Sequence, residues 1–312
     1  MSCFLGIDTS NYTTSVCLFD SISDEVISLR KLLPVKKGEK GLRQSDAVFH
    51  HTRQLAPLIE ELFKDFDGKL DGIGVSFAPR TEEGSYMPCF TVGLNAARVL
   101  ASALRIPLFE FSHQQGHIAA ALYSISRLDL IDQPHIAFHI SGGTTEAILV
   151  NSDEGLLSTR IIAKTLDLNA GQLIDRVGVM LGLPFPCGKE LEKLALHCDE
   201  EIVVKPTMKG LDCCLSGGEN QCKQLLDSGK TSEYIARYAI EYILAAIREM
   251  TAGIVKEYPG LPIVFAGGVM SDSIIRDAMT ARYDCLFSKP EYSSDNAAGV
   301  AVLASLTHHR IS

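Results

Sequence analysis

The 312-residue sequence lacks the segments that define several common classes of protein. No apolar run approaches the ~18 residues needed to span a bilayer. No basic stretch precedes the acidic Asp8 near the start, which is not the pattern of a secretory signal peptide. The nine cysteines are scattered, without a CxxC pair of zinc-site spacing. We therefore expect a cytoplasmic protein with no membrane partner, whose cysteines are ordinary free thiols.

Basic residues are also scarce relative to acidic ones. The chain has 29 Lys and Arg against 38 Asp and Glu, a formal net charge of −9. Such a balance is a poor match for the phosphates of nucleic acid, so any binding to nucleic acid requires a local basic patch or a partner. Lys36, Lys37, Lys40 and Arg43 lie in a polar stretch, residues 35–46, that we interpret as a solvated loop.

Several familiar catalytic motifs are missing as well. Neither a GxxxxGK[ST] phosphate loop nor a GxGxxG fingerprint occurs, which disfavours Walker-type and Rossmann-type nucleotide sites. No HExxH motif and no recognisable Ser/His/Asp order is present, which disfavours protease activity. Hydrophobic residues make up 46% and charged residues 21%, as in folded globular proteins. The length suggests two domains or one duplicated unit.

The two halves of the chain begin alike. Residues 3–8, a Thr/Ser turn and residues 15–19 predict a β-hairpin, and residues 135–140, a Gly-rich turn and residues 146–150 predict another. Each hairpin is followed by a strand-like run and then by helical periodicity, which indicates an internal duplication. Further strands are predicted at 70–77 and 262–265, and helices at 49–66, 92–104, 170–181, 189–197 and 232–258. The Ala-rich segment 92–104 is apolar nearly all round, which predicts a helix packed inside the protein.

The segment 111–118 contains two histidines, His113 and His117, four residues apart. On a helix they project from one face, at about the spacing that two imidazoles need to share a metal ion. The alternative is a pair of capping or surface histidines near a helix start.

Two glycine pairs are candidates for phosphate binding. Ser141, Gly142 and Gly143 form a turn between two strands, and Gly267 and Gly268 separate a strand from a helix predicted to start near Ser271. Backbone N–H groups of such turns approach anions closely. Each pair alone is more often a tight turn. Two of them, one in each presumed arm of a cleft, favour a nucleotide site.

These motifs, taken together, resemble the TsaD family of tRNA threonylcarbamoyladenosine synthases, formerly called O-sialoglycoprotein endopeptidases or glycoproteases. The resemblance spans nearly the whole chain. It rests on seven short motifs in the family's order and spacing: residues 6–10 (GIDTS), 113–117 (HQQGH), 141–143 (SGG), 170–175 (AGQLID), 210–217 (GLDCCLSG), 266–269 (AGGV) and 294–296 (SDN).

The resemblance implies an α/β protein with the actin-like ATPase fold, in which two duplicated lobes clasp a nucleotide and metal cleft. We expect an N-terminal lobe over residues 1–112 and a C-terminal lobe over 113–312, with most of the metal and adenylate site in the second. It also implies transfer of a threonylcarbamoyl group from an adenylate to adenosine in tRNA. A TsaB-like partner subunit and a small ATPase are the implied partners, with tRNA engaged through the assembly.

The family's functional residues map onto this sequence as follows. One divalent ion, iron or zinc, is expected on His113, His117 and Asp295, with His139 as a further candidate ligand that is equally well interpreted as a buried strand histidine. The adenylate is expected on His139, Ile140, Ser141, Gly142, Gly143, Asp175, Gly188, Gly267, Gly268 and Asp272. No residue is assigned as a catalytic base.

The sequence also departs from the family pattern. The turn after the first strand reads Thr-Ser-Asn-Tyr-Thr-Thr over residues 9–14 and lacks both carboxylates that the family usually has there, and a Gly-Pro-Gly turn is replaced by residues 79–86. Asp272 stands where the family usually has Asn. These changes keep two alternatives open: carbamoyl transfer to an acceptor other than tRNA, and a non-catalytic scaffold that pairs with an active relative.

Overall fold

The computed structural model describes residues 2–10, 12–34, 42–153, 156–292 and 297–311, and the chain divides into two units. Unit 1 comprises Met1–Ile131, Asp153–Leu157 and Glu291–Ser312, and unit 2 comprises Asp132–Ser152 and Ser158–Pro290. This division differs from the expected boundary between residues 112 and 113. The first unit includes the helix that starts at His113 and also the C-terminal helix of the chain. These two helices pack against each other and against the first sheet.

Unit 1 is built on a five-stranded sheet with the order β3-β2-β1-β4-β5. The strands are β1 (Cys3–Asp8), β2 (Thr13–Asp20), β3 (Glu25–Leu32), β4 (Leu70–Ala78) and β5 (Leu108–Ser112). The first three form an antiparallel meander, whereas β1, β4 and β5 run parallel. The carboxyl ends of β1, β4 and β5 therefore lie at one edge of the sheet, where α/β proteins commonly place their sites.

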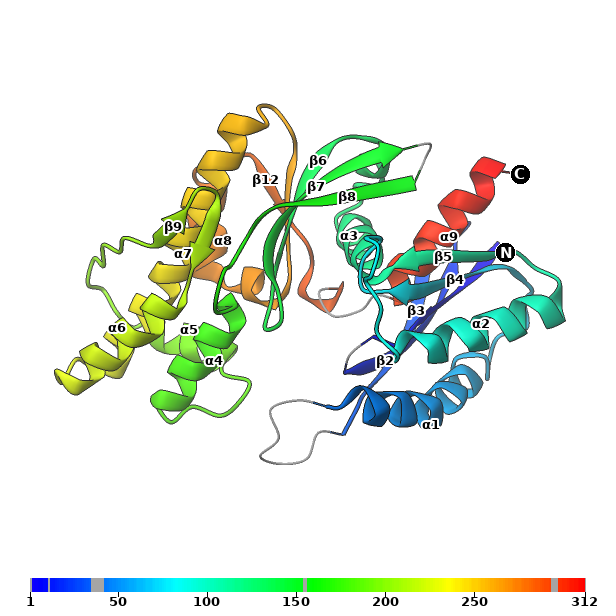
Figure 1. Cartoon of the computed structure of the whole chain (residues 1–312), viewed down its shortest axis with the longest axis horizontal. Helices are drawn as coiled ribbons and strands as arrows, with labels where there is room; N and C mark the ends of the chain where they lie inside the picture. Colours follow the sequence, from blue (N-terminus) through cyan, green and yellow to red (C-terminus); the bar gives the residue numbers. More distant parts are fainter. Residues whose placement is uncertain (1, 11, 35–41, 154–155, 293–296, 312) are drawn as a thin grey trace. The chain divides into compact units, whose positions relative to one another are not determined.

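Helices cover both faces of this sheet, as Figure 1 shows. Leu5 and Ile7 of β1 pack on one face against α1 (Gln44–Leu62) and α2 (Phe90–Leu104). Gly6 faces the other way, where a Cβ would lie 2.0 Å from the carbonyl oxygen of Ala297, the first residue of α9 (Ala297–Ile311). Side chains alternate between the faces of a strand, so one β1 residue without a Cβ lets α9 lie directly on the sheet. Helix α3 (His113–Ser124) packs beside α9.

The expectation that the helix over 92–104 lies inside the protein is wrong. Helix α2 buries one face, which includes Ala97 and Ala101, while Val99 is 68% exposed. On the outer side Arg98 forms an ion pair with Glu110 of β5 at 2.8 Å. Small alanines on both sides of this helix hide its amphipathic pattern in the sequence, which explains the error.

Unit 2 repeats the plan of unit 1. Its sheet has the order β12-β11-β6-β7-β8, formed by β6 (His135–Ile140), β7 (Thr145–Asp153), β8 (Leu156–Lys164), β11 (Ile263–Ala266) and β12 (Cys285–Phe287). The β6–β7 hairpin matches β1–β2, and β11 and β12 run parallel to β6 as β4 and β5 do to β1. The predicted duplication is thus confirmed.

The core of unit 2 lies between this sheet and a layer of helices. Phe138, Phe265 and Phe287 stack across three neighbouring strands, with ring centroids 4.7 and 5.1 Å apart. The 26-residue helix α7 (Ser232–Glu257) buries one long face in the same core. The remaining elements are α4 (Ala170–Met180), α5 (Gly188–Ala195), α6 (Ser216–Asp227), α8 (Ser273–Thr280), the β9 (Thr207–Lys209) and β10 (Asp212–Cys214) ribbon, and the 3₁₀ turns η1 (Leu128–Asp132), η2 (Gly268–Ser271) and η3 (Pro290–Tyr292).

All nine cysteines are free thiols, as predicted. Six of them are buried, and burial raises the pKa of Cys213 and Cys222 to about 12. Buried thiols of this kind behave as small apolar side chains rather than as nucleophiles. Within the described residues, no helix meets the length and hydropathy that a bilayer-spanning segment requires.

Candidate functional site

The helix predicted around the two histidines is α3, and His113 is its first residue. Ser112 caps it: the Ser112 Oγ accepts from the N–H of Gln115 at 3.2 Å, and the Gln115 Oε1 accepts from the N–H of Ser112 at 2.7 Å. The histidines are therefore not the caps. Their rings lie on one face of the first turn, with centroids 4.5 Å apart.

Asp8, the last residue of β1, contacts His113 directly. Its Oδ2 lies 2.9 Å from the His113 Nδ1, and it also accepts a hydrogen bond from the hydroxyl of Ser76. Its Oδ1 accepts from the N–H of Ser10 at 2.9 Å. Burial alone would raise the pKa of Asp8, but the neighbouring His113 and the hydrogen bonds outweigh it and lower this pKa to about 2. The carboxylate is thus ionised at neutral pH.

Sheet topology explains why these residues meet. Asp8 ends β1, Ser76 lies near the end of β4, and His113 follows β5, and these three strands are parallel neighbours. Sequence reasoning noted Asp8 only as part of a short motif and missed its contact with His113. Part of the signal was available, because Asp8 and Ser76 stand at or near the ends of predicted strands, whereas the strand before His113 was not predicted.

The described residues fit a bound metal ion in two respects. Two imidazoles share one helix face, and the Nδ1 of one is engaged by a carboxylate, as is usual for histidines that bind metal through Nε2. The third expected ligand, Asp295, lies outside the described residues. Among those that the structure describes, no group of three or more His, Cys, Asp or Glu side chains comes together as a metal site.

Close packing fixes the position of α3. A Cβ at Gly299 of α9 would lie 1.9 Å from the carbonyl oxygen of Gly116, which stands between the two histidines in the sequence. The two helix backbones are therefore in contact at this crossing.

In unit 2, the Ser141 turn connects β6 and β7 and is held by the start of α4. The N–H of Gly171 donates to the Ser141 carbonyl at 3.1 Å, and the Asn169 side chain donates to the Gly143 carbonyl at 3.0 Å. A Cβ at Gly142 or Gly143 would meet nothing within 4 Å, so the outer side of this turn is open. This geometry is suited to an anion that approaches the backbone.

The second glycine pair adjoins the first. Gly267 has φ +102°, and a Cβ there would lie 2.2 Å from the carbonyl oxygen of Ile140 at the end of β6. Both glycine turns thus stand at neighbouring strand ends of unit 2, which corrects the expectation of one in each arm of a cleft. The reason is that the second turn follows β11, which pairs with β6 in the same sheet.

Asp272 lies just after this second turn and caps α8, where its Oδ1 accepts from the N–H of Ile275 at 3.1 Å. Asp272 as a whole residue is only 7% exposed. The pKa of Asp272 is raised to about 6, mainly by burial and further by the charge of the nearby Glu192. The hydrogen bond from the Ile275 N–H acts in the opposite direction and lowers this pKa. Glu192 of α5, in turn, accepts from the N–H of Ser273 at 2.8 Å. Sequence reasoning did not single out Glu192, although it stands one turn after Gly188.

Asp175 and Gly188 are joined through Cys187. The N–H of Cys187 donates to the Asp175 Oδ1 at 2.9 Å, and α5 begins at the next residue, Gly188. The predicted adenylate residues therefore come together in unit 2, since α5 links Asp175 at one end to Asp272 through Glu192. His139 also belongs to unit 2, at the end of β6 opposite Glu146, and whether it binds a metal stays a prediction.

The two units contain sheets with the same strand order. Each sheet has a hairpin, parallel crossover strands and flanking helices, and this arrangement defines an actin-like α/β protein. Comparison with known proteins agrees. A family model described as "TsaD: tRNA N6-adenosine threonylcarbamoyltransferase" matches residues 25–302. The chain therefore belongs to the TsaD family.

Relatives and solved structures give the extent of the similarity. The chain is 30% identical to a "Probable bifunctional tRNA threonylcarbamoyladenosine biosynthesis protein" of Methanothermobacter thermautotrophicus, over 97% of this chain and 55% of that protein. It thus spans about half the length of that relative. It is 27% identical to a "tRNA N6-adenosine threonylcarbamoyltransferase" of Thermotoga neapolitana, over 95% of this chain and 91% of that protein. Full-length HypF has a similar fold, with a TM-score of 0.62 and 13% identity over 99% of this chain and 56% of that one.

Proposed function

We propose that this protein transfers a threonylcarbamoyl group from an adenylate donor to adenosine in tRNA. The observation that carries the proposal is the family match over residues 25–302, with the His113 and His117 pair placed on one face of a capped helix. The names of the curated relatives support the same reaction class.

We assign the donor adenylate to unit 2. The open turn at Gly142 and Gly143 and the turn at Gly267 and Gly268 offer backbone N–H groups to its phosphate. Asp175 would accept a hydrogen bond from a ribose hydroxyl, and Asp272 would lie near the adenine. The support for this assignment is the convergence of these residues at one edge of the unit 2 sheet.

A divalent ion, iron or zinc, would be held by His113, His117 and Asp295, with His139 a further candidate. When bound, such an ion supplies Lewis-acid stabilisation to the carbonyl and phosphate oxygens of the donor. The role of the protein groups is to hold the two imidazoles at a fixed separation, which the capping of α3 and its contact with α9 provide.

The transfer step forms one bond and breaks one. The N6 amine of adenosine attacks the carbonyl carbon of the threonylcarbamoyl group, a C–N bond forms, and the C–O bond of the mixed anhydride breaks. AMP leaves with the electron pair, and the proton of the amine goes to solvent or to the departing phosphate. No described side chain is assigned as the base, and the role proposed for the protein groups in this step is to position donor and acceptor.

Binding of tRNA is proposed to require an assembly. The net charge of −9 gives the isolated chain little attraction for phosphates. A TsaB-like partner subunit and a small ATPase are the proposed members of that assembly. The chain alone should therefore bind tRNA weakly and with a shallow dependence on salt, and tight binding by the isolated protein would contradict this.

The test combines metal analysis of the purified protein with calorimetric titration of AMP and threonylcarbamoyl-adenylate. Wild type should carry near-stoichiometric metal and bind the adenylate, and His113→Ala should lose the metal. His197→Ala removes an exposed histidine from α5's C-terminal end in unit 2 and should change neither. If wild type binds neither metal nor adenylate, the transferase proposal fails and a scaffold role replaces it.

A further inference from the structure

The Asp8 carboxylate has three hydrogen-bonding partners in a site that is almost closed to solvent. Oδ1 takes the N–H of Ser10 at 2.9 Å, while Oδ2 takes the hydroxyl of Ser76 and faces the His113 Nδ1 at 2.9 Å. The side chain of Asp8 is 2% exposed. The carboxylate is therefore held by the backbone of Ser10, by Ser76 of β4 and by His113 of α3.

An ionised carboxylate has no proton to donate, so each of its neighbours must be a donor. The Ser10 N–H and the Ser76 hydroxyl already act as donors to it. It follows that the Nδ1 of His113 carries a proton. In a neutral imidazole the lone pair then belongs to Nε2, the nitrogen with which such a histidine binds a metal.

We propose that Asp8 is a positioning residue that keeps the proton of His113 on Nδ1 and so assigns Nε2 to metal binding. This inference rests on the proposed function, in which His113 is a ligand. The ring itself is also fixed in direction: Phe90 contacts it edge-on at 5.9 Å between centroids, and His117 contacts it at 4.5 Å. Asp8 thus decides which nitrogen binds, while the packing decides where the ring lies.

The substitution Asp8→Asn gives a sharp expectation. The N–H of Ser10 can only donate, so the amide oxygen of Asn must take the place of Oδ1. The amide NH₂ then takes the place of Oδ2 and donates to the His113 Nδ1. The imidazole must accept at Nδ1, which moves its proton to Nε2 and removes the lone pair needed for a metal. The hydroxyl of Ser76 adapts by rotating, because it can donate or accept.

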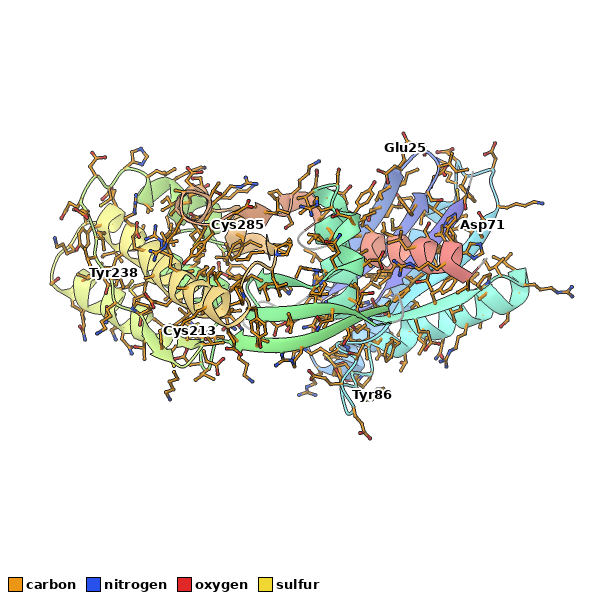
Figure 2. The ribbon with its side chains drawn as sticks, turned by 90° about the horizontal axis from the view of Figure 1, so that it is seen from above. Glu25, Asp71, Tyr86, Cys213, Tyr238 and Cys285 are labelled. Atoms are coloured by element: carbon orange, nitrogen blue, oxygen red, sulfur yellow. The ribbon has the colours of Figure 1, made fainter. Side chains whose placement is uncertain are left out.

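The tautomer can be measured without any metal. Metal-free protein labelled with ¹⁵N-histidine is studied by long-range ¹H–¹⁵N NMR under alkaline conditions, where imidazoles are neutral. The His113 signals are assigned by their absence in His113→Gln. Wild type should have the proton on Nδ1, and Asp8→Asn should have it on Nε2. The control Asp71→Asn makes the same chemical change at the opposite end of the β1–β4 pair, where Asp71 (labelled in Figure 2) accepts from the N–H of Cys3. This control should keep the wild-type tautomer.

A second measurement follows Co²⁺ binding by its absorption spectrum. Asp8→Asn should weaken Co²⁺ binding by about 10- to 100-fold, as is usual when a carboxylate behind a metal-binding histidine is lost. Ser76→Ala leaves the carboxylate in place, so it should keep the Nδ1 proton and lose far less affinity.

The outcomes separate this inference from the proposed function. The inference is overturned if His113 of the wild-type protein carries its proton on Nε2. It is also overturned if Asp8→Asn leaves the His113 tautomer unchanged. If the variant does not fold, the wild-type spectrum alone decides. If the tautomers behave as expected but wild type binds no Co²⁺, the control of His113 by Asp8 stands and the metal-dependent transferase is what fails.

Discussion

The backbone N–H of Cys187 donates to the Asp175 Oδ1 at 2.9 Å, so the carboxylate assigned to the ribose also holds the connection between α4 and α5. Two substitutions at Asp175 should therefore differ. Asp175→Asn keeps an oxygen for the Cys187 N–H but places an NH₂ group where Oδ2 stood. We expect it to fold with nearly unchanged stability and to bind AMP about 5- to 10-fold more weakly, because the acceptor for a ribose hydroxyl is lost.

Asp175→Ala removes both interactions at once. It leaves the Cys187 N–H without its acceptor in a buried position, which should cost about 1 to 3 kcal/mol of unfolding free energy in addition to the loss of AMP binding. Urea denaturation and calorimetry on the two variants measure the two effects separately. Equal AMP affinity in wild type and Asp175→Asn would remove Asp175 from the ribose site.

Gly171 is predicted to be essential for the shape of the Ser141 turn. A Cβ at Gly171 would lie 2.7 Å from backbone atoms of Gly142, so Gly171→Ala must push the turn away from α4. We expect a loss of about 1 to 3 kcal/mol in stability and at least a tenfold loss in AMP binding. Gly143→Ala places a Cβ in open space and should leave the unfolding free energy within about 0.5 kcal/mol of wild type. Similar stability losses in both variants would contradict the packing argument.

The sequence was sufficient for most of the secondary structure and for the duplicated plan. Hairpins, buried strands and amphipathic helices each have a local pattern, and the residues 113–117 formed the expected helix. The placement of α2 was not predictable in the same way. Alanines lie on both of its faces, so local composition gives no sign of which face packs on the sheet.

The candidate site was predictable residue by residue but not as an arrangement. His113, Gly142 and Asp175 were predicted because each lies in a recognisable local sequence motif. The contact between Asp8 and His113 spans more than a hundred residues and depends on β1, β4 and β5 being parallel neighbours. Such a relation follows from sheet topology, which hydrophobic periodicity does not specify.

The crossing of α3 and α9 gives a prediction about the histidine pair. A Cβ at Gly299 would lie 1.9 Å from the carbonyl oxygen of Gly116 in α3, whereas a Cβ at Gly74 would lie 2.1 Å from the carbonyl oxygen of Val300. Gly299→Ala and Gly74→Ala should each destabilise the protein by about 1 to 3 kcal/mol. Only Gly299→Ala displaces the helix of His113 and His117, so it should weaken Co²⁺ binding by more than tenfold, and Gly74→Ala should weaken it much less. Equal losses of Co²⁺ affinity would show that the crossing does not position the pair.

Because of Asp272, we expect the stability of the protein to depend on pH in an unusual way. Its pKa is about 6 in the folded protein against an ordinary value of 3.8, mainly because of burial. Between those values the folded state binds more protons than the unfolded state. The contribution of Asp272 to stability therefore falls as pH rises from about 4 to about 6, and the cost of the buried charge persists above that range. A shift of this size corresponds to a cost of up to about 3 kcal/mol.

Asp272→Asn removes that cost and keeps the cap of α8, because Asn is as good an N-cap as Asp. We expect the variant to be more stable than wild type by about 1 to 2 kcal/mol at about pH 8 and to equal it at about pH 4. Urea denaturation at the two pH values measures this difference. Asp277→Asn, an exposed change on the same helix, serves as the control and should shift neither value by more than about 0.5 kcal/mol. The argument would be contradicted if Asp272→Asn gained the same stability at both pH values. The gain would then come from the amide group itself and not from removal of the buried charge.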